Sequence, residues 1–355
     1  MDKSDELLKK DILTKNNKKV KEQTLKRYLK SFDLDELIRF LTPKVFVDEE
    51  TGNISDMEMI NINSKKNLIN YITNNLEDIL KCFIEKTRTE EVNQLKFILE
   101  NNNKDLLFDE CPLSLNFIND LKILCFTKVY YNNKKDLIKF FMPIEFIETF
   151  NKILKDKEVL EKNKYYNDIY DYTESIINTY GIITLTKLLE LFEKQMFKIE
   201  EEKLINIVNL SLSYDKLIFH PSEEDVLVCN LEFSNEDAAE EFYKDQTEDY
   251  KIYSKEEYKK ISSYDYLYEL KSYNELKNYF SNNYKTIEID FEKFKKSIVT
   301  NYINIAQVSI DSANEFFKIH IKYFIEVDNE TEDYILKLVN DIFENYPKWR
   351  KRGNV

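Results

Sequence analysis

The fold is decided by residues 165–230, which read YYNDIYDYTESIINTYGIITLTKLLELFEKQMFKIEEEKLINIVNLSLSYDKLIFHPSEEDVLVCN. In three parts of this stretch apolar residues recur at helical spacing, and near its end two β-rich runs flank a polar turn. Gly181 follows the first helical pattern directly, at a C′ position where a left-handed conformation costs little. Ile182 and Ile183 are expected to form a short strand. The order of helix, strand, helix, helix and hairpin predicts a winged helix.

The second and third helices of this stretch have clear start signals. Thr184 or Thr186 is expected to cap the second helix, because a threonine oxygen can accept a bond from a free backbone N–H. The acids at positions 200–202 suit the first turn of the third helix, where they complement the helix dipole. The expected core face of the second helix is Leu185, Leu188, Leu189 and Phe192. The wing is expected to run from Lys216 to Cys229, with His220 exposed beside its turn.

An internal echo points to a second unit of the same kind. Residues 128–131 (KVYY), a polar turn and residues 136–139 (DLIK) parallel residues 216–219 (KLIF), a polar turn and residues 225–228 (DVLV). Each hairpin pattern follows at least two helical patterns. We therefore expect two winged-helix-like units in tandem; the alternative is two unrelated helix–hairpin arrangements.

The composition predicts a mainly helical fold. The 355 residues include only three glycines and five prolines. Chains poor in both are usually helical, because turns and sheets rely on residues with positive or fixed φ. We expect a mainly α fold with small β-hairpins, in which tandem winged-helix-like units precede a helical C-terminal domain.

The changes in pattern along the chain divide it into four parts. These are a basic helical arm (1–32), a first helical, winged-helix-like domain (33–155), a second winged-helix-like domain (165–230) and an acidic, Tyr-rich helical C-terminal domain (231–355). Asp33 or Asp35 is expected to cap a short helix that Pro43 ends. The charged run 155–164 is expected to be a linker or an exposed helix end, and a weaker hairpin is expected within 45–62.

Charge and cysteine usage predict a cytoplasmic protein. The net charge is −14, which disfavours a large nucleic-acid surface but permits a local one. The first residues are charged throughout and no run of about 18 apolar residues occurs, so neither a signal peptide nor a membrane span is expected. The four cysteines lie far apart in apolar settings, which is typical of reduced, buried thiols. The oligomeric state is left open.

Motifs for catalysis and cofactors were sought, and none stands out. No two glycines lie close enough to form a phosphate-binding loop. No Cys-x-x-Cys or His-x-x-x-His pair predicts a metal site. His220 and His320 are the only histidines, and we expect the first in a turn and the second at a helix boundary rather than in catalysis. Carboxylate chemistry needs a buried acid with a shifted pKa, which the sequence cannot reveal. We expect no cofactor, no metal and no catalytic residue.

Nucleic-acid binding is the functional class that a winged helix suggests first. In the second unit the third helix begins with acids at positions 200–202, and acids at 223–225 follow at the wing tip, so a phosphate backbone would be repelled. The first unit and the basic arm are better suited. If the chain contacts nucleic acid, the candidate residues are Lys18, Lys19, Lys21, Lys26, Arg27, Lys134 and Lys135.

The C-terminal residues carry a resemblance to a protein family. The run from Asn345 to Gly353, NYPKWRKRG, resembles the Asn-x-Thr-Pro-x-Trp-x-x-x-Gly ending of uncharacterised proteins from low-GC bacteria, and residues 180–184 (YGIIT) are also similar to theirs. Those proteins often carry a SEC-C zinc-binding tail. Tyr346 stands where Thr is usual, and no cysteine follows Gly353, so the metal role is not carried over. The resemblance implies no activity.

Two functions are expected from these patterns. The first is a non-enzymatic protein-interaction or regulatory module whose partner is another protein. The alternative is a DNA-binding regulator that uses the basic N-terminal arm and the first winged-helix-like unit. An enzyme of unrecognised type comes third.

Overall fold

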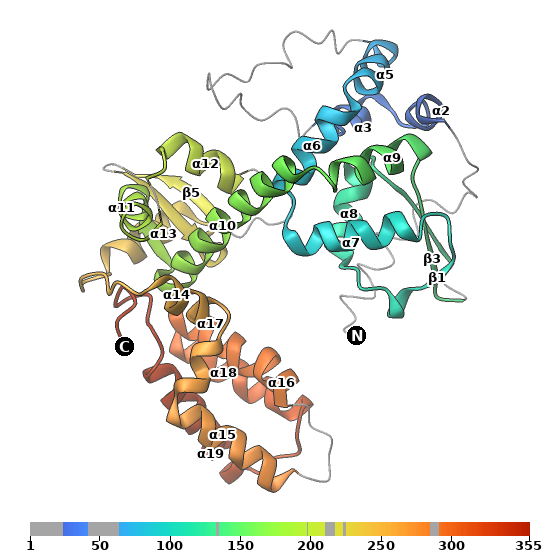
Figure 1. Cartoon of the computed structure of the whole chain (residues 1–355). Helices are drawn as coiled ribbons and strands as arrows, with labels where there is room; N and C mark the ends of the chain where they lie inside the picture. Colours follow the sequence, from blue (N-terminus) through green and yellow to red (C-terminus); the bar gives the residue numbers. More distant parts are fainter. Residues whose placement is uncertain are drawn as a thin grey trace. The chain divides into compact units, whose positions relative to one another are not determined.

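The computed structural model describes residues 24–41, 64–132, 135–196, 198–209, 217–222, 225–284 and 291–355 (Figure 1). The chain is mainly helical and has two small three-stranded antiparallel sheets, as the composition predicts. It divides into two compact units, which are described separately. Unit 1 comprises Met1–Tyr170 and Glu202–Tyr214, and unit 2 comprises Asp171–Glu201 and Asp215–Val355. The hairpin expected within 45–62 and most of the basic arm lie outside the described residues, and the four-domain division stays a prediction.

Unit 1 is built around helices with recognisable sequence boundaries. Its elements are α2 (Leu25–Leu29), α3 (Leu34–Arg39), α5 (Lys65–Asn74), α6 (Leu76–Lys86), α7 (Thr89–Glu100), β1 (Leu106–Leu107), α8 (Leu115–Ile123), β2 (Lys128–Asn132), β3 (Leu137–Phe141), α9 (Ile144–Ile153), the first part of α10 (Lys157–Tyr180) and most of α12 (Glu201–Asn209). Asp33 caps α3 in a capping box with Glu36, as one of the two expected choices. Pro143 precedes α9, where its missing N–H removes no helical bond.

The sheet of unit 1 has the strand order β1-β3-β2. Strands β2 and β3 form the hairpin that the echo predicts, with Lys128 opposite Phe141 and Asn132 opposite Leu137. Strand β1 was not expected from the sequence, because two residues are too few to establish an alternating pattern.

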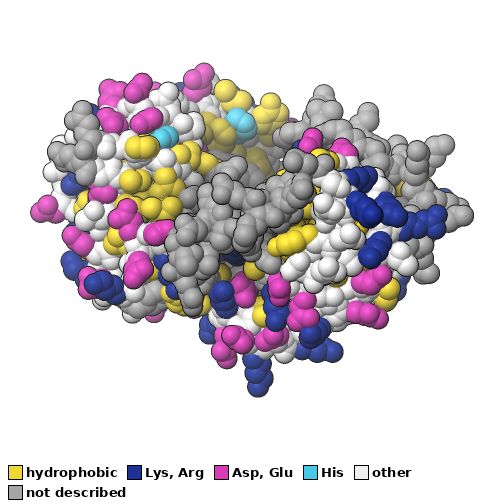
Figure 2. Space-filling view, turned by 90° about the horizontal axis from the view of Figure 1, so that it is seen from above, with side chains coloured by type: hydrophobic (Ala, Val, Ile, Leu, Met, Phe, Trp, Pro, Cys, Tyr) yellow, Lys and Arg dark blue, Asp and Glu magenta, His cyan; other side chains and the backbone are white. Residues whose placement is uncertain are grey.

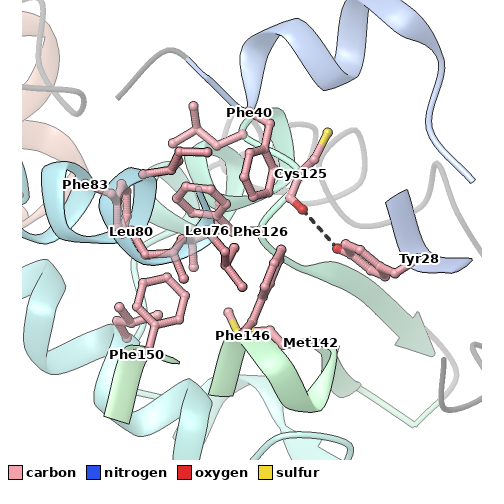
Figure 3. Close-up of a cluster of buried hydrophobic side chains, with 14 of the residues drawn as sticks. Tyr28, Phe40, Leu76, Leu80, Phe83, Cys125, Phe126, Met142, Phe146 and Phe150 are labelled. Carbon is pink, nitrogen blue, oxygen red and sulfur yellow. Dashed lines mark hydrogen bonds between the residues drawn. The ribbon is translucent and has the colours of Figure 1, made fainter. Parts of the chain in front are cut away.

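The core of unit 1 is an aromatic cluster (Figure 3). Phe126 lies at its centre, and its ring meets the rings of four phenylalanines edge-on, with centroids 4.7–6.3 Å apart. These four are Phe40, Phe83, Phe146 and Phe150. Tyr28 of α2 packs edge-on against Phe146, and its hydroxyl donates a 3.1 Å hydrogen bond to the backbone oxygen of Cys125. Each buried ring contributes about 1.5–3 kcal/mol, so α2 is fixed firmly to this core.

The charged run 155–164 is neither a linker nor a frayed end. It belongs to α10, a helix of 24 residues, and the expectation of a linker was wrong. The run contains no Gly or Pro, and its inward side is buried by Val159 and Asn163. The Asn163 side chain donates hydrogen bonds to the backbone oxygens of Ile84 (2.6 Å) and Thr87 (2.7 Å) at the end of α6. The charges therefore lie on the exposed side of a helix whose other side is packed.

Unit 2 contains the second sheet and the C-terminal helices. Its elements are the last part of α10, β4 (Ile182–Thr184), α11 (Leu185–Gln195), β5 (Leu217–Pro221), β6 (Val226–Asn230), α13 (Glu236–Lys244), α14 (Lys255–Ser262), α15 (Lys271–Asn283), α16 (Phe291–Phe294), α17 (Thr300–Val308), α18 (Ile310–His320) and α19 (Asn329–Glu344). Helices α15, α17, α18 and α19 pack together. The tyrosine-rich region thus forms short helices, as predicted.

The second sheet has the order β4-β6-β5, the same arrangement as the first sheet. In each sheet the short first strand pairs with the second strand of the hairpin. Thr184 caps α11 by accepting a 3.3 Å bond from the Lys187 backbone N–H. One detail of the predicted core face of α11 was wrong: Leu189 is only half-buried and Leu191 is buried instead, because the packed stripe is rotated toward Leu191.

The C-terminal run from Tyr346 packs onto the junction of α10 and β4. Trp349 is buried, and its indole N–H donates a 2.9 Å bond to the backbone oxygen of Asn178. Gly181 has a φ of +73°, and a Cβ there would lie 2.5 Å from Cδ2 of Trp349. The Gln246 side-chain amide donates to the backbone oxygens of both Tyr180 and Trp349. The two stretches that carry the family resemblance are therefore in direct contact.

Candidate functional surfaces

The predicted nucleic-acid contacts do not form one site. Lys18, Lys19, Lys21 and Lys134 lie outside the described residues. Lys26, Arg27 and Lys135 are exposed. Helix α2 packs against the Lys128–Phe141 end of the β2–β3 hairpin, where Tyr28 meets Phe141, whereas Lys135 lies at the turn end. Five paired positions separate the two ends, so at roughly 3.3 Å per residue the structure does not bring Lys135 to the α2 cations.

A different set of cations gathers around α2. The Nζ atom of Lys65, in the first turn of α5, donates a 2.9 Å bond to the backbone oxygen of Lys30, which caps the end of α2. Among the described residues, none of the five cations of α2, its cap and this first turn forms an ion pair. We call this group the cationic cluster; it consists of Lys26, Arg27, Lys30, Lys65 and Lys66. Figure 2, a view from the side of α2 and α5, shows Lys and Arg side chains gathered in one region of unit 1.

The acids beside the cationic cluster are used by helix ends. Asp33 accepts a bond from the Glu36 backbone N–H and Glu36 accepts one from the Asp33 backbone N–H, both at 2.8 Å. A Glu145 carboxylate oxygen accepts a 3.0 Å bond from the backbone N–H of Leu25. Sequence reasoning missed Lys30 and Lys65 because 35 positions separate them.

The wing tip of unit 2 includes an acid with a structural role. One carboxylate oxygen of Asp225 accepts a 3.2 Å bond from the backbone N–H of Thr186, in the first turn of α11. The other accepts a 2.7 Å bond from the backbone N–H of Val226. A carboxylate at a helix N-terminus is favoured by the dipole. Asp225 therefore joins the wing to α11, and the expected repulsion of phosphate by this wing stays a prediction.

A hollow of about 660 Å³ lies beside this contact. Its charged groups are paired with one another: Lys187 with Glu190 at 2.8 Å, and Lys244 with Glu240 at 3.1 Å. Tyr250 forms part of its wall. Because each lysine has an acid beside it, the hollow exerts little net attraction on a charged ligand.

The two histidines occupy different environments. His220 is buried, and its Nε2 atom lies 2.8 Å from the backbone oxygen of Phe233, to which it must donate. The expectation that His220 is exposed was wrong, because the strand extends through Pro221 and turns this side chain inward. His320 lies at the end of α18 and is half-buried, as expected for a boundary residue.

One carboxyl group in unit 1 titrates near neutral pH. Burial raises the pKa of Asp120 to about 7, and the nearby charge of Glu91 adds to the effect. Glu91 is buried and accepts a 3.2 Å bond from the backbone N–H of Arg88. Such a carboxyl is suited to proton transfer, but the geometry alone assigns it no reaction. Within the described ranges, no three His, Cys, Asp or Glu residues gather in a way that could hold a metal ion.

An exposed aromatic stripe runs along α18 and the 3-10 turn that follows it. The stripe consists of Phe316, Ile319, His320 and Tyr323, which recur at helical spacing. The Phe316 and His320 rings stack with centroids 4.2 Å apart, and Nδ1 of His320 donates to the Phe316 backbone oxygen at 2.8 Å. Ile319 is 52% exposed and Tyr323 is 80% exposed. Sequence reasoning assigned Phe316 to the core and did not separate the stripe from the buried face that carries Phe317 and Ile321.

Comparisons with protein-family models, curated proteins and solved structures found no match. Among the helices that the structure describes, none combines the length and the apolar character needed to cross a bilayer.

Proposed function

We propose that this chain is a non-enzymatic protein-interaction or regulatory module of the cytoplasm, and that a protein partner binds the aromatic stripe of α18. The observation that carries the proposal is the exposure of Ile319 and Tyr323 beside the Phe316–His320 stack. Isolated apolar residues on a surface need no explanation, but a contiguous aromatic patch is typical of an interaction site.

The chemistry of the stripe suits a binding hot spot. Tyrosine supplies a large apolar area with a hydroxyl that can remain hydrogen-bonded, and such residues dominate the energy of many interfaces. The Phe316–His320 stack and the backbone bond from His320 hold two members of the stripe in place. A partner would therefore bind a surface that is already ordered, and little side-chain entropy would be lost.

The test is a pull-down from the native host with quantitative mass spectrometry. The bait is the full chain, either wild type or with Ile319→Gln and Tyr323→Gln together. Ile252→Gln is the matched control, because Ile252 is also an exposed apolar residue of unit 2. Loss of a hot spot is worth about 2 kcal/mol, or about 30-fold in affinity, so the partner should be lost from the double variant and kept by the control. Recovery of the same proteins with the double variant would refute the proposal.

The second candidate is a DNA-binding regulator that uses the basic arm and the first winged-helix-like unit. The observation that favours it is the exposure of Lys26 and Arg27 without an ion-pair partner among the described residues. Titration of a labelled duplex at about 50 and 200 mM salt tests it, since phosphate contacts produce a steep loss of affinity with salt. Absence of binding at the lower salt concentration would eliminate this candidate.

A further inference from the structure

We infer that the cationic cluster of α2 and α5 is a contact surface for the phosphate backbone of nucleic acid and that it binds without reading the base sequence. The inference rests on the DNA-binding candidate and deepens it, since it assigns the contact to a defined set of residues. Three of these, Lys30, Lys65 and Lys66, were not among the contacts expected from the sequence.

The first argument is that the cluster is not arranged for stability. Lys65 and Lys66 occupy the first turn of α5, which contains no acid, and the Ser64 side chain makes no capping bond. The positive end of the helix dipole disfavours cations at this position. Lys65 and Lys30 also lie close together without a neutralising carboxylate among the described residues. A local arrangement that opposes folding is expected where a binding function requires it.

The second argument is that the cations are held on ordered supports. Leu25, Tyr28 and Leu29 of α2 are buried, and the Tyr28 hydroxyl is bonded to the Cys125 backbone. The bond from Lys65 to the Lys30 backbone joins the first turn of α5 to the end of α2. Lys26 and Lys30 are one helical turn apart, about 6 Å at 1.5 Å per residue. Duplex DNA carries one charge per about 1.7 Å of its axis, so the cluster can face several phosphates together.

The third argument concerns the kind of anionic partner. Four of the five cations are lysines, namely Lys26, Lys30, Lys65 and Lys66. Lysine is depleted in protein interfaces, where arginine is enriched, and a planar carboxylate is matched better by an arginine fork than by an ammonium group. Base readout also relies on bidentate groups such as Arg, Asn and Gln. A lysine-rich cluster is therefore better suited to phosphates than to an acidic protein segment or to base edges.

The experiment measures the salt dependence of binding by the full chain. Fluorescence anisotropy follows two labelled duplexes of unrelated sequence between about 50 and 200 mM salt. The slope of log K against log salt falls by about 0.9 for each lost phosphate contact in B-DNA. The triple variant Lys26→Gln/Arg27→Gln/Lys30→Gln should lower the slope by up to about 2.7, and the double variant Lys65→Gln/Lys66→Gln by up to about 1.8.

A matched control comes from unit 1 itself. Lys96 and Lys135 are exposed cations outside the cluster, and the double variant Lys96→Gln/Lys135→Gln should keep the wild-type slope. Circular dichroism checks that each variant is folded. The stripe variant Ile319→Gln/Tyr323→Gln should bind the duplexes like wild type, so failure of the proposed protein partner would leave this result unchanged.

Three outcomes would overturn the inference. If wild type does not bind either duplex at about 50 mM salt, the DNA-binding candidate fails together with it. If wild type binds and the cluster variants keep its slope, the candidate survives but the cluster is not the contact. If a labelled poly-glutamate peptide binds in a cluster-dependent manner and the duplexes do not, the surface recognises an acidic protein segment instead.

Discussion

Replacement of Gly181 by alanine tests the packing of the C-terminal run on the end of α10. The new Cβ would lie 2.5 Å from Cδ2 and 2.7 Å from Cγ and Cε3 of Trp349, and φ at this position is +73°. A non-glycine residue in the left-handed region costs about 1–2 kcal/mol. An overpacked contact adds about 1–3 kcal/mol. We therefore expect Gly181→Ala to lower the free energy of unfolding by about 2–5 kcal/mol.

A double-mutant cycle separates the two contributions. Trp349→Ala alone should cost about 3–5 kcal/mol, because a buried ring is removed. In that background the new methyl group meets no indole, so Gly181→Ala should cost only the backbone part, about 1–2 kcal/mol. The two substitutions should therefore be non-additive by about 1–3 kcal/mol.

Urea unfolding followed by far-UV circular dichroism measures all four chains of the cycle. Trp349 is the single tryptophan of the protein, so its fluorescence also reports on unit 2 in the chains that keep it. If the two costs add to within about 0.5 kcal/mol, as they do for independent sites, the close approach of Gly181 to Trp349 is refuted.

Two further predictions concern unit 1. The native state keeps a proton on Asp120 up to a pKa of about 7, whereas an unfolded chain releases it above about pH 4. The wild type therefore loses stability as pH rises through this window, and Asp120→Asn should be more stable than wild type by about 1–2 kcal/mol at pH 8, a value reduced for solvent screening of this partly exposed group. Melting temperatures at pH 4 and pH 8 check this: equal differences at both would contradict it. Asn163→Ala should destabilise unit 1 by about 1–3 kcal/mol, since it leaves the buried backbone oxygens of Ile84 and Thr87 without this donor; an unchanged urea midpoint would argue against those bonds.

Features set by neighbouring residues could be predicted from the sequence. The Asp33 cap, the Thr184 cap and the left-handed Gly181 all depend on a few consecutive positions. The tyrosine-rich helices and both hairpins also followed from local periodicity.

Features set by distant residues could not be predicted. The charged run 155–164 is polar enough to suggest a linker, and only its packing against α6 reveals a helix. His220 was misplaced because its burial depends on Phe233, in the turn that follows the sheet. The cationic cluster depends on the contact of Lys30 with Lys65, which no local pattern encodes.

The bond between Trp349 and Asn178 also constrains when unit 2 can be completed during protein synthesis. The two residues are 171 positions apart. At about 5–20 residues per second, the ribosome needs about 10–30 s to make the intervening chain. During that interval the end of α10 and strand β4 have been made, but the indole that packs on Gly181 has not. The last turn of α10 must therefore wait for a distant part of the same chain, and a chaperone that binds apolar surface would have its best opportunity during this delay.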